Sequence, residues 1–386
     1  MGVRIVEPVP RPARWRNAAV AAARRIYHAP GRTAFARRLS ALNVPAREGI
    51  GLNFGWIDAP SREQETRIGG GVKLSHLRER FGEARDRFNV LYLVSSVLHL
   101  VPNAAALVRW AKARGVAVVW NQNGVAYPAW RGADYPWFNE PMRELIAQAD
   151  HVIFQSEFCR GCADRYLGAI AAESEILWNP VDAGHFSPAT SAPPANVWQL
   201  LAMGTNHSFY RVKASLDALG VLVRRGFSVR LAIAGEFRWE NGDREVAGYI
   251  EREKLHDHVK LLPRFTQEEA PGIYRRAHVL LHPKYKDPCP TVPIEAMACG
   301  VPVVGSNSGG MPELVPDVAG RLVDVPEDWE RDHAPDAELV ADAVVGIMGR
   351  HAEFSQGARA HAAAHFDRVK WVDRHAAIFG RLLGGR

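Results

Sequence analysis

The stretch that decides the fold is HPKYKDPCPTVPIEAMACGVPVVGSNSGGMPELV, residues His282–Val315. It follows an apolar run at His278–Leu281 and contains a helical pattern at Pro293–Ala298. Pro293 suits the start of a helix, where its missing N–H would have no partner in any case. The loop and the helix N-terminus together offer unpaired N–H groups and the positive end of a dipole. This combination predicts a site for phosphate.

Two carboxylates flank the start of this predicted helix. Asp287 lies in the loop and Glu295 lies just inside the helix, eight positions later. Both can accept hydrogen bonds from the hydroxyl groups of one ligand while the helix dipole holds its phosphates. Gly309 and Gly310 predict a second sharp turn, because glycine adopts backbone conformations closed to other residues. The segment therefore indicates a ligand that carries phosphate and hydroxyl groups.

Short apolar runs alternate with helical patterns on both sides of this segment. The predicted strands are 50–54, 90–95, 116–120, 151–155, 175–178, 198–203, 229–234, 259–262, 278–281, 301–304 and 321–325. The predicted helices are 72–81, 104–114, 142–149, 157–167, 213–224, 246–254, 267–276, 293–298 and the tail from 337 onward. Near-continuous apolar strands separated by helices are typical of parallel sheets covered on both faces.

The pattern predicts two α/β halves within the 386 residues, in agreement with about 150 residues per domain. The proline- and serine-containing stretch 183–196 is the predicted linker. We expect an N-terminal arm at 1–48, a first domain at 49–182, a second domain at 197–365 and a final helical segment at 366–386.

Composition excludes several classes of protein. Apolar residues make up 47% and charged residues 23%, an ordinary globular mixture rather than a disordered or fibrous one. The most apolar stretch, Val90–Val101, is shorter than the roughly 20 residues that span a membrane. We find no pattern of a signal peptide and no disulfide framework among four cysteines. The sequence therefore predicts a cytoplasmic protein.

The formal net charge of +6 is concentrated at one end of the chain. Residues 1–48 carry +8 and the other 338 residues sum to −2, which argues against nucleic acid as a partner. Two short helical patterns lie in this arm, one around Trp15 and one with Phe35, Leu39 and Leu42. Each can lie on anionic lipid, as a peripheral contact with the inner face of the membrane, or pack on the domain with a solvated arginine face.

The segment from His282 to Val315 resembles the donor-site signature of the retaining GT-B glycosyltransferases of the group 1 family. The family pattern has an acidic residue, seven residues and then Glu, followed by a Gly-Gly-x-x-Glu turn. The resemblance implies two Rossmann-like, doubly wound parallel-sheet domains that face a cleft. Asp287 departs from the usual Glu, and Pro288-Cys289-Pro290 replaces the usual Phe-Gly.

The resemblance assigns roles to residues of this donor segment. It implies that Glu295 binds the ribose and that Asp287, as a catalytic residue, contacts the transferred sugar. Backbone N–H groups near Thr291 and Val292 would hold the diphosphate, and the Gly309-Gly310 turn would line the nucleotide pocket.

Further matches lie outside the donor segment. Gly204 with Lys213 resembles a Gly-Arg…Lys element whose cations neutralise the diphosphate. Thr205 replaces the family Arg, so we expect Lys213 to act on the leaving phosphate and Arg211 to be the weaker candidate. In the first domain, Gly70 and Gly71 resemble a glycine loop near the sugar, with an ordinary loop as the alternative. After the strand at 116–120 the family often has a His that reaches the transferred sugar. This chain has Asn121 and Asn123 there, and we expect Asn123, or else Asn121, to donate a hydrogen bond to a sugar hydroxyl as the catalytic candidate.

Several alternatives carry less weight. Cys159 and Cys162 form a single C-x-x-C pair with no second pair, which disfavours a zinc or redox site. An NAD-linked oxidoreductase would need a G-x-G-x-x-G motif, which Gly69–Gly71 does not provide. A non-catalytic nucleotide- or glycan-binding protein of the same fold remains open, since the first-domain His is missing.

The resemblance implies a glycosyltransferase of polysaccharide or glycolipid biosynthesis. The donor would be a nucleotide sugar, used as a co-substrate without a resident cofactor or metal. The acceptor would be a glycan, a lipid-linked sugar or a small molecule, and transfer would proceed with retention.

Overall fold

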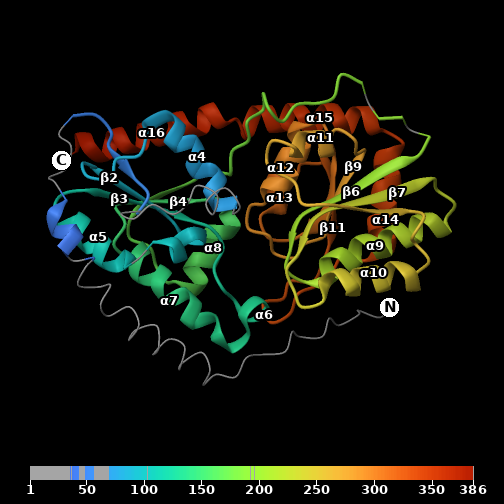
Figure 1. Cartoon of the computed structure of the whole chain (residues 1–386), viewed down its shortest axis with the longest axis horizontal. Coiled ribbons are helices and arrows are strands. Elements are labelled where there is room, and N and C mark those ends of the chain that lie inside the picture. The colour runs from blue at the N-terminus through green and yellow to red at the C-terminus, as the bar shows by residue number, and fades with distance from the viewer. Residues whose placement is uncertain are drawn as a thin grey trace. The chain divides into compact units, whose positions relative to one another are not determined.

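The computed structural model describes residues 35, 37–42, 48–55, 69–101, 103–191, 193–194 and 196–385. Most of the predicted arm, including the helical pattern around Trp15, lies outside these residues. The chain forms two compact units. The C-terminal unit contains residues 179–328 and 332–368, and the N-terminal unit contains the described residues up to Trp178, Trp329–Arg331 and the residues from Val369 onward. Each unit has its own parallel sheet and its own hydrophobic core (Figure 1).

The N-terminal unit is built on a five-stranded parallel sheet. Its strands follow chain order across the sheet, β1-β2-β3-β4-β5. Their bounds are β1 Leu52–Asn53, β2 Val90–Val94, β3 Ala117–Gln122, β4 His151–Phe154 and β5 Glu173–Ile176. The central strands β2, β3 and β4 are fully buried, as their near-continuous apolar sequences predict.

Helices cover both faces of this sheet. They are α4 (Gly69–Phe81), α5 (Ala104–Ala113), α6 (Pro128–Arg131), α7 (Tyr135–Ile146), α8 (Glu157–Tyr166) and α16 (Arg368–Gly384), with 3₁₀ turns η1 (Ser95–Leu100) and η2 (Gly132–Asp134). Figure 1 shows α16 on one side of the sheet and α5 and α7 on the other. The final helix predicted at 366–386 is α16, and from Val369 onward it belongs to the N-terminal unit.

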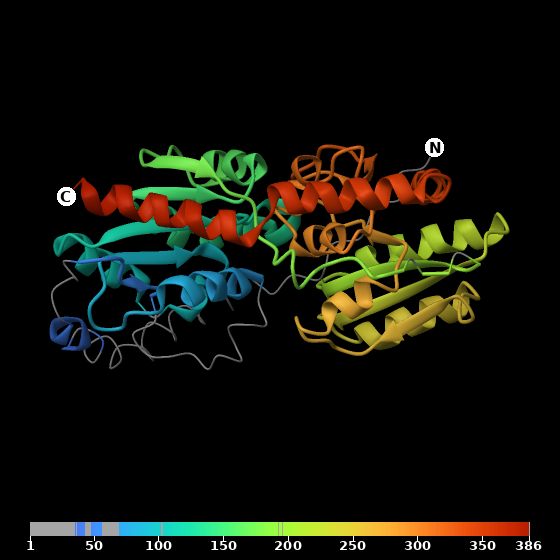
Figure 2. The ribbon, with the colours of Figure 1, turned by 90° about the horizontal axis from the view of Figure 1, so that it is seen from above.

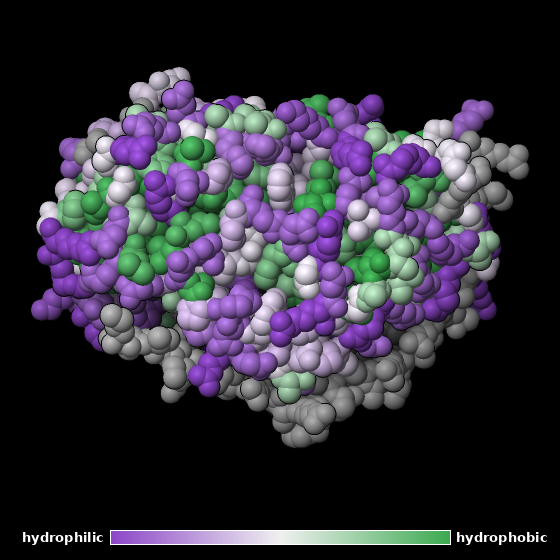
Figure 3. Space-filling model, turned by 180° about the vertical axis from the view of Figure 1, so that it is seen from behind, coloured by the Kyte–Doolittle hydropathy of each residue, from purple (hydrophilic) through white to green (hydrophobic). Residues whose placement is uncertain are grey.

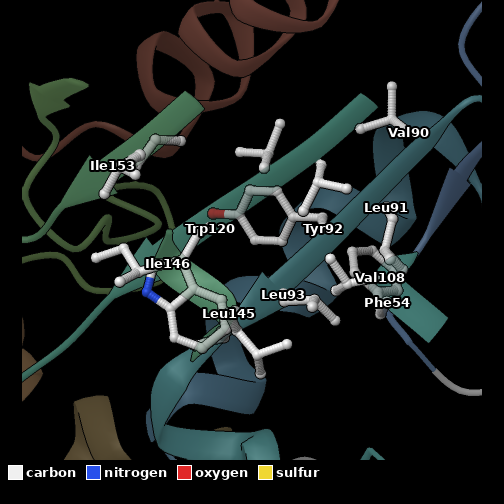
Figure 4. Packing of buried hydrophobic residues seen from close by; sticks show 14 of the residues in the cluster. Phe54, Val90, Leu91, Tyr92, Leu93, Val108, Trp120, Leu145, Ile146 and Ile153 are labelled. Carbon is white, nitrogen blue, oxygen red and sulfur yellow. The ribbon is translucent and has the colours of Figure 1, made fainter. Parts of the chain in front are cut away.

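Two large aromatic side chains organise the core on the two faces of the N-terminal sheet. Trp120 lies beside Leu145 and Ile146 of α7 (Figure 4). On the opposite face, Tyr92 meets Phe379 of α16 edge to face, with ring centroids 6.1 Å apart. Tyr92 is paired with Val119, so the two residues face the same side of the sheet. Trp120 is the next residue along β3 and therefore faces the other side.

The C-terminal unit is built on a six-stranded parallel sheet of order β11-β10-β9-β6-β7-β8. Its strands are β6 Trp198–Asn206, β7 Val229–Phe237, β8 Val259–Leu262, β9 Val279–His282, β10 Val303–Asn307 and β11 Gly320–Asp324. From β6 the chain builds outward in one direction through β7 and β8, and then in the other through β9, β10 and β11. The strand order therefore reverses between β6 and β9, which is where open α/β sheets bind ligands.

Helices lie on both faces of this second sheet. They are α9 (Phe209–Arg224), α10 (Gly242–Arg252), α11 (Ala270–Tyr274), α12 (Thr291–Ala298), α13 (Met311–Leu314), α14 (Ala337–Met348) and α15 (His351–His365). Figures 1 and 2 show α9, α10 and α14 on one face and α11, α12 and α15 on the other.

The predicted linker 183–196 is packed onto the C-terminal unit along part of its length. The guanidinium of Arg275 donates to the carbonyl oxygens of His185 and Ser187, at 3.2 and 2.7 Å. Arg359 donates to the carbonyl oxygens of Ala183 and Phe186. The described part of this segment is therefore held by arginine side chains, and the unit begins at Asn179 rather than at residue 197.

The structure bears on the membrane contact predicted for the arm. Phe35 and Leu39, the apolar face of the second helical pattern, are buried in the core of the N-terminal unit. This part of the arm therefore packs on the domain. Figure 3 shows one face of the molecule, where hydrophobic residues lie in patches between hydrophilic ones. Among the described residues, no helix is long and apolar enough to cross a membrane.

Candidate functional site

The candidate donor site lies at the reversal point of the C-terminal sheet. Gly204, near the end of β6, has a φ of +116°, and a Cβ there would lie 3.4 Å from the Val292 side chain. The structure thus brings Gly204 to the first turn of α12, which contains Thr291 and Val292. The N–H groups of a helix's first turn have no partner within the helix, so this corner is suited to an anion. The helix begins at Thr291, so Pro293 occupies its third position rather than its first.

Asp287 is a buried carboxylate that is held by a lysine and a histidine side chain. One oxygen lies 3.0 Å from His282 Nε2, and the other lies 2.8 Å from Lys284 Nζ. Burial alone raises the pKa of a carboxyl group. Here Lys284 and His282 outweigh burial and hold the pKa of Asp287 well below its usual range. Asp287 is therefore an anion at any pH near neutrality, fixed in one orientation.

The Gly309-Gly310 turn packs directly against the Asp287 loop. The Gly310 N–H donates to the Asp287 carbonyl oxygen at 2.8 Å, and the Lys286 N–H donates to Ser308 Oγ at 2.9 Å. Gly309 has a φ of +66°, and a Cβ there would lie 2.5 Å from the Asp287 carbonyl oxygen. Glycine is therefore required at 309 both by the left-handed backbone and by the close approach of the two loops.

Replacement of Gly309 by alanine is expected to destabilise the protein by about 2–4 kcal/mol, the sum of left-handed strain and overpacking. The expected displacement of the Asp287 loop would also weaken nucleotide binding. The matched control is Gly248→Ala in α10, where nothing lies within 4 Å of an added Cβ. That variant should gain about 0.5–1 kcal/mol. Urea unfolding of both variants measures the difference, and equal stability would contradict the assigned packing.

Glu295 lies on the second turn of α12 and is also buried. Gln267 Nε2 donates to one carboxylate oxygen at 2.7 Å, and the Tyr274 hydroxyl donates to the other at 2.8 Å. Burial raises the pKa of Glu295, although both hydrogen bonds act in the opposite direction. Gln267 is exposed, so its amide is the partner that a ligand hydroxyl could replace without disturbing the core.

The two candidate cations on α9 lie in different surroundings. Lys213 pairs with Asp217 at 2.5 Å, and its Nζ lies 5.0 Å from the Tyr249 ring centroid, on the side of α10. Arg211 lies beside Tyr210, with 3.4 Å between its Nε and the tyrosine hydroxyl oxygen, and interacts with the charge of Asp287. Residues two apart on a helix face opposite sides. The structure therefore brings Arg211, rather than Lys213, together with Asp287.

Two charged residues of this cluster were not predicted from the sequence. Lys284 is three residues before Asp287 and pairs with it, and burial lowers the pKa of its ammonium group. Asp332 comes from a distant loop, and burial raises its pKa to about 6 although Arg211 and Lys284 pull it down. Only Lys284 could have been found from the sequence, because it stands three residues before Asp287 and carries the opposite charge. Asp332 is too distant in sequence to be paired with this cluster.

The candidate asparagines of the N-terminal unit, Asn121 and Asn123, lie at the end of β3. The predicted glycine loop is wrong in one respect, because Gly69, Gly70 and Gly71 form the first turn of α4. Asn123 is half-buried beside Ser95, whose Oγ accepts from the Asn123 N–H at 2.9 Å. Asn121 is fully engaged in the core.

Asn121 belongs to a buried polar network in this unit. Its side-chain oxygen accepts from Lys73 Nζ at 2.6 Å, and its amide donates to the Tyr92 hydroxyl at 3.0 Å. Tyr92 in turn meets His375 Nε2 of α16 at 2.9 Å. Burial lowers the pKa of His375 to about 3, so it is neutral. These contacts account for Asn121 within the core, which leaves Asn123 as the polar side chain at the strand end.

The described residues offer no group of three or more His, Cys, Asp or Glu side chains arranged to hold a metal ion. Cys159 and Cys162 lie on α8 with their thiols buried, and neither forms a disulfide. The hydroxyl of Ser156 caps α8 by accepting from the Cys159 N–H at 3.0 Å.

The donor-site residues lie in a part of the chain that is similar to a known family. Residues 189–342 match the family described as "Glycosyl transferases group 1". The matched segment contains α9, the Asp287 loop, α12 and the Gly309-Gly310 turn, and it carries all the donor-site contacts described above.

Two curated relatives are similar to the chain over part of its length. A D-inositol 3-phosphate glycosyltransferase of Salinispora arenicola is 38% identical over 266 residues, which cover 62% of this chain and 56% of the relative. One of Segniliparus rotundus is 28% identical over 241 residues, covering 59% of this chain and 51% of the relative. The matched part thus spans about half the length of these relatives.

Solved structures of glycosyltransferases share the fold. Sucrose-phosphate synthase from Thermosynechococcus elongatus superposes with a TM-score of 0.63 at 18% identity, over 84% of this chain and 79% of that one. Anabaena Alr3699/HepE in complex with UDP-glucose gives 0.63 at 18% identity, over 81% and 82%. The chain has the GT-B fold of two parallel-sheet α/β domains, as the sequence resemblance implied.

Proposed function

We propose that this protein transfers a sugar from a nucleotide-sugar donor to a glycan, lipid-linked or small-molecule acceptor, with retention. The observation that carries the proposal is the corner formed by Gly204, the Asp287 loop and the first turn of α12. It combines an anion-binding helix N-terminus with two buried carboxylates, Asp287 and Glu295. The relatives are glycosyltransferases by name, and the Anabaena protein is solved with UDP-glucose, which supports a nucleotide-sugar donor.

Each residue of the corner would contact a different part of such a donor. The α12 N-terminus and Arg211 would hold the diphosphate and stabilise the charge that develops on it as the sugar departs. Glu295 would accept hydrogen bonds from the ribose hydroxyls, which would replace the hydrogen bond from the Gln267 amide. Asp287, which is fixed by His282 and Lys284, would position the sugar hydroxyls. Asn123 is the proposed polar contact on the acceptor side.

A thermal-shift screen with nucleoside diphosphates and a turnover assay together test this function. A nucleoside diphosphate that binds only the folded protein raises its melting temperature. We expect a shift with one of UDP, GDP, ADP and TDP, and hydrolysis or transfer with the matching nucleotide sugar. Binding without turnover against any acceptor would favour the non-catalytic alternative, which none of the named relatives supports. No shift with all four nucleotides would contradict the donor site itself.

A membrane contact through the arm remains a prediction, now confined to the residues before Phe35. Deletion of residues 1–34 leaves Phe35 and Leu39 in the core of the N-terminal unit. We expect this deletion to reduce cosedimentation with phosphatidylglycerol vesicles, because it removes seven of the ten arginines of the arm. Equal cosedimentation of the full chain and the deletion variant would contradict the contact.

A further inference from the structure

An exposed aromatic surface lies on the segment that joins β3 to β4. We define the aromatic ledge as Trp130, Arg131, Tyr135, Trp137 and Phe138, which belong to α6 and to the first turn of α7. Trp130 and Trp137 are 50% and 52% exposed. Large apolar rings exposed side by side are unusual on a protein surface and mark interaction sites.

Arg131 is stacked between two rings of the ledge. The carbon at the centre of its guanidinium lies 4.5 Å from the Trp130 ring centroid and 4.3 Å from that of Phe138. Trp137 meets Phe138 edge to face at 4.9 Å. No carboxylate forms an ion pair with Arg131 in the described part of the chain. The cation–π contacts therefore fix the guanidinium plane while its N–H donors remain available to a ligand.

A cavity of about 330 Å³ adjoins the ledge. Its wall is formed by Pro128, Gly132, Ala133, Tyr135 and Glu330, which all belong to the N-terminal unit. The volume is at the lower end of the range of about 300–1,000 Å³ found for small-molecule sites. An aromatic ring, a carboxylate and apolar atoms therefore surround a space suited to a small polar ring.

The position of the ledge in the fold associates it with the proposed reaction. The segment starts at Asn123, directly after β3, and β3 is the central strand of its sheet. Ligands of parallel α/β sheets bind at the carboxyl ends of the strands. The ledge and its cavity thus belong to the ligand-binding edge of the N-terminal unit, on the same strand end as the proposed acceptor contact.

We propose that the aromatic ledge and the adjoining cavity bind a pyranose ring of the acceptor. This inference rests on the proposed function, since it gives the acceptor its chemical class. The apolar C–H face of a sugar packs on an indole ring, and its hydroxyl groups pair with the Glu330 carboxylate and the Arg131 donors. Trp130 and Trp137 are specificity residues in this proposal, because they select a ligand that has a flat apolar face and a polar edge.

A lipid surface fits the same residues less well. Trp and Arg do gather at membrane interfaces. However, Glu330 lines the cavity. Its carboxylate would repel an anionic lipid surface. The concave, partly acidic surroundings favour a neutral carbohydrate.

The test compares three variants of the full chain, Trp130→Ala, Trp137→Ala and the control Leu339→Ala. Leu339 is 51% exposed on α14 in the other unit, so it controls for loss of an exposed apolar side chain. The probes are maltotriose, cellotriose and triacetylchitotriose. Their binding is measured by calorimetry and by tryptophan fluorescence. We expect one of them to bind the native protein, and each Trp variant to bind it about tenfold more weakly. The control should bind as the native protein does.

Other outcomes separate this inference from the proposed function. The melting-temperature shift with nucleoside diphosphates should be unchanged in the Trp variants, because the donor residues lie in the C-terminal unit. If no trisaccharide binds, or if the Trp variants bind as tightly as the control, the carbohydrate ledge is overturned and the donor site stands. If vesicles of phosphatidylglycerol bind the native protein and not the Trp variants, the ledge is a lipid contact. If a trisaccharide binds but no nucleotide does, the proposed function fails, and the ledge stands as a carbohydrate site without the role of acceptor site.

Discussion

Replacement of Asp287 by alanine is expected to lower turnover of the nucleotide-sugar donor by about 10²–10³-fold, the usual effect of removing one preorganised polar group from an active site. The expected loss follows from the contacts of Asp287. Asp287 is buried, its carboxylate is held by His282 and Lys284, and its backbone oxygen anchors the Gly309-Gly310 turn. Removal of the carboxylate leaves Lys284 without its ion-pair partner and removes the acceptor proposed for the sugar hydroxyls. Donor turnover under saturating nucleotide sugar measures the effect.

The matched variant is Asp287→Asn, which keeps the shape and one hydrogen-bond acceptor but removes the charge. We expect it to fold as the native protein does, to retain the melting-temperature shift with the nucleotide, and to lose most of its turnover. This combination would separate positioning of the sugar from binding of the nucleotide. Turnover of Asp287→Asn within threefold of the native value would contradict a role for the carboxylate charge.

Replacement of Arg211 by alanine is expected to weaken nucleotide-diphosphate binding by about 10–100-fold, as loss of a hydrogen bond between charged groups costs about 1.5–3 kcal/mol. Arg211 interacts with the charges of Asp287 and Asp332, and it lies on the first turn of α9. Calorimetric titration with the nucleoside diphosphate found in the screen gives the change in Kd. High salt should reduce the difference between the native protein and the variant.

Lys213→Ala is the matched control for this second prediction. Lys213 also carries one positive charge on α9, but it pairs with Asp217 and stacks on Tyr249. We expect its loss to change nucleotide binding less than twofold and to reduce stability by about 0.3–0.5 kcal/mol, the value of a helix ion pair. If Lys213→Ala weakens nucleotide binding more than Arg211→Ala does, the assignment made from the sequence resemblance is the correct one.

The strands of the C-terminal unit could be predicted well because each is an apolar run between turn residues. The strand predicted at 259–262 is observed with the same bounds. The helices were less predictable. Three glycines at 69–71 disfavour a helix, yet α4 starts there because Leu74 and Leu77 are buried and hold it in place. Likewise α7 starts at Tyr135 rather than at the predicted residue 142, since its internal Pro141 is tolerated within the packed unit.

The donor site was predictable where its residues are close in sequence. Asp287, Glu295, Gly309 and Gly310 lie within one segment of known spacing, and the structure brings the Asp287 loop and the glycine turn together. The partners that come from elsewhere were not predictable. Asp332 meets Arg211 and Lys284 only because the loop after β11 returns to the cluster. The sequence also could not show which of Arg211 and Lys213 faces Asp287, because α9 starts at Phe209 and the predicted helix started only at residue 213.

The contribution of α16 to the N-terminal unit has a consequence for the order of folding during synthesis. Trp371, Ile378 and Phe379 of this helix belong to the buried core of a unit whose other core residues lie mostly before residue 178. The ribosome therefore completes the C-terminal unit, residues 179–368, before the N-terminal unit has all of its core. We expect the first half of the nascent chain to remain incompletely packed until the last helix emerges, so that the second half to be made is the first to become stable.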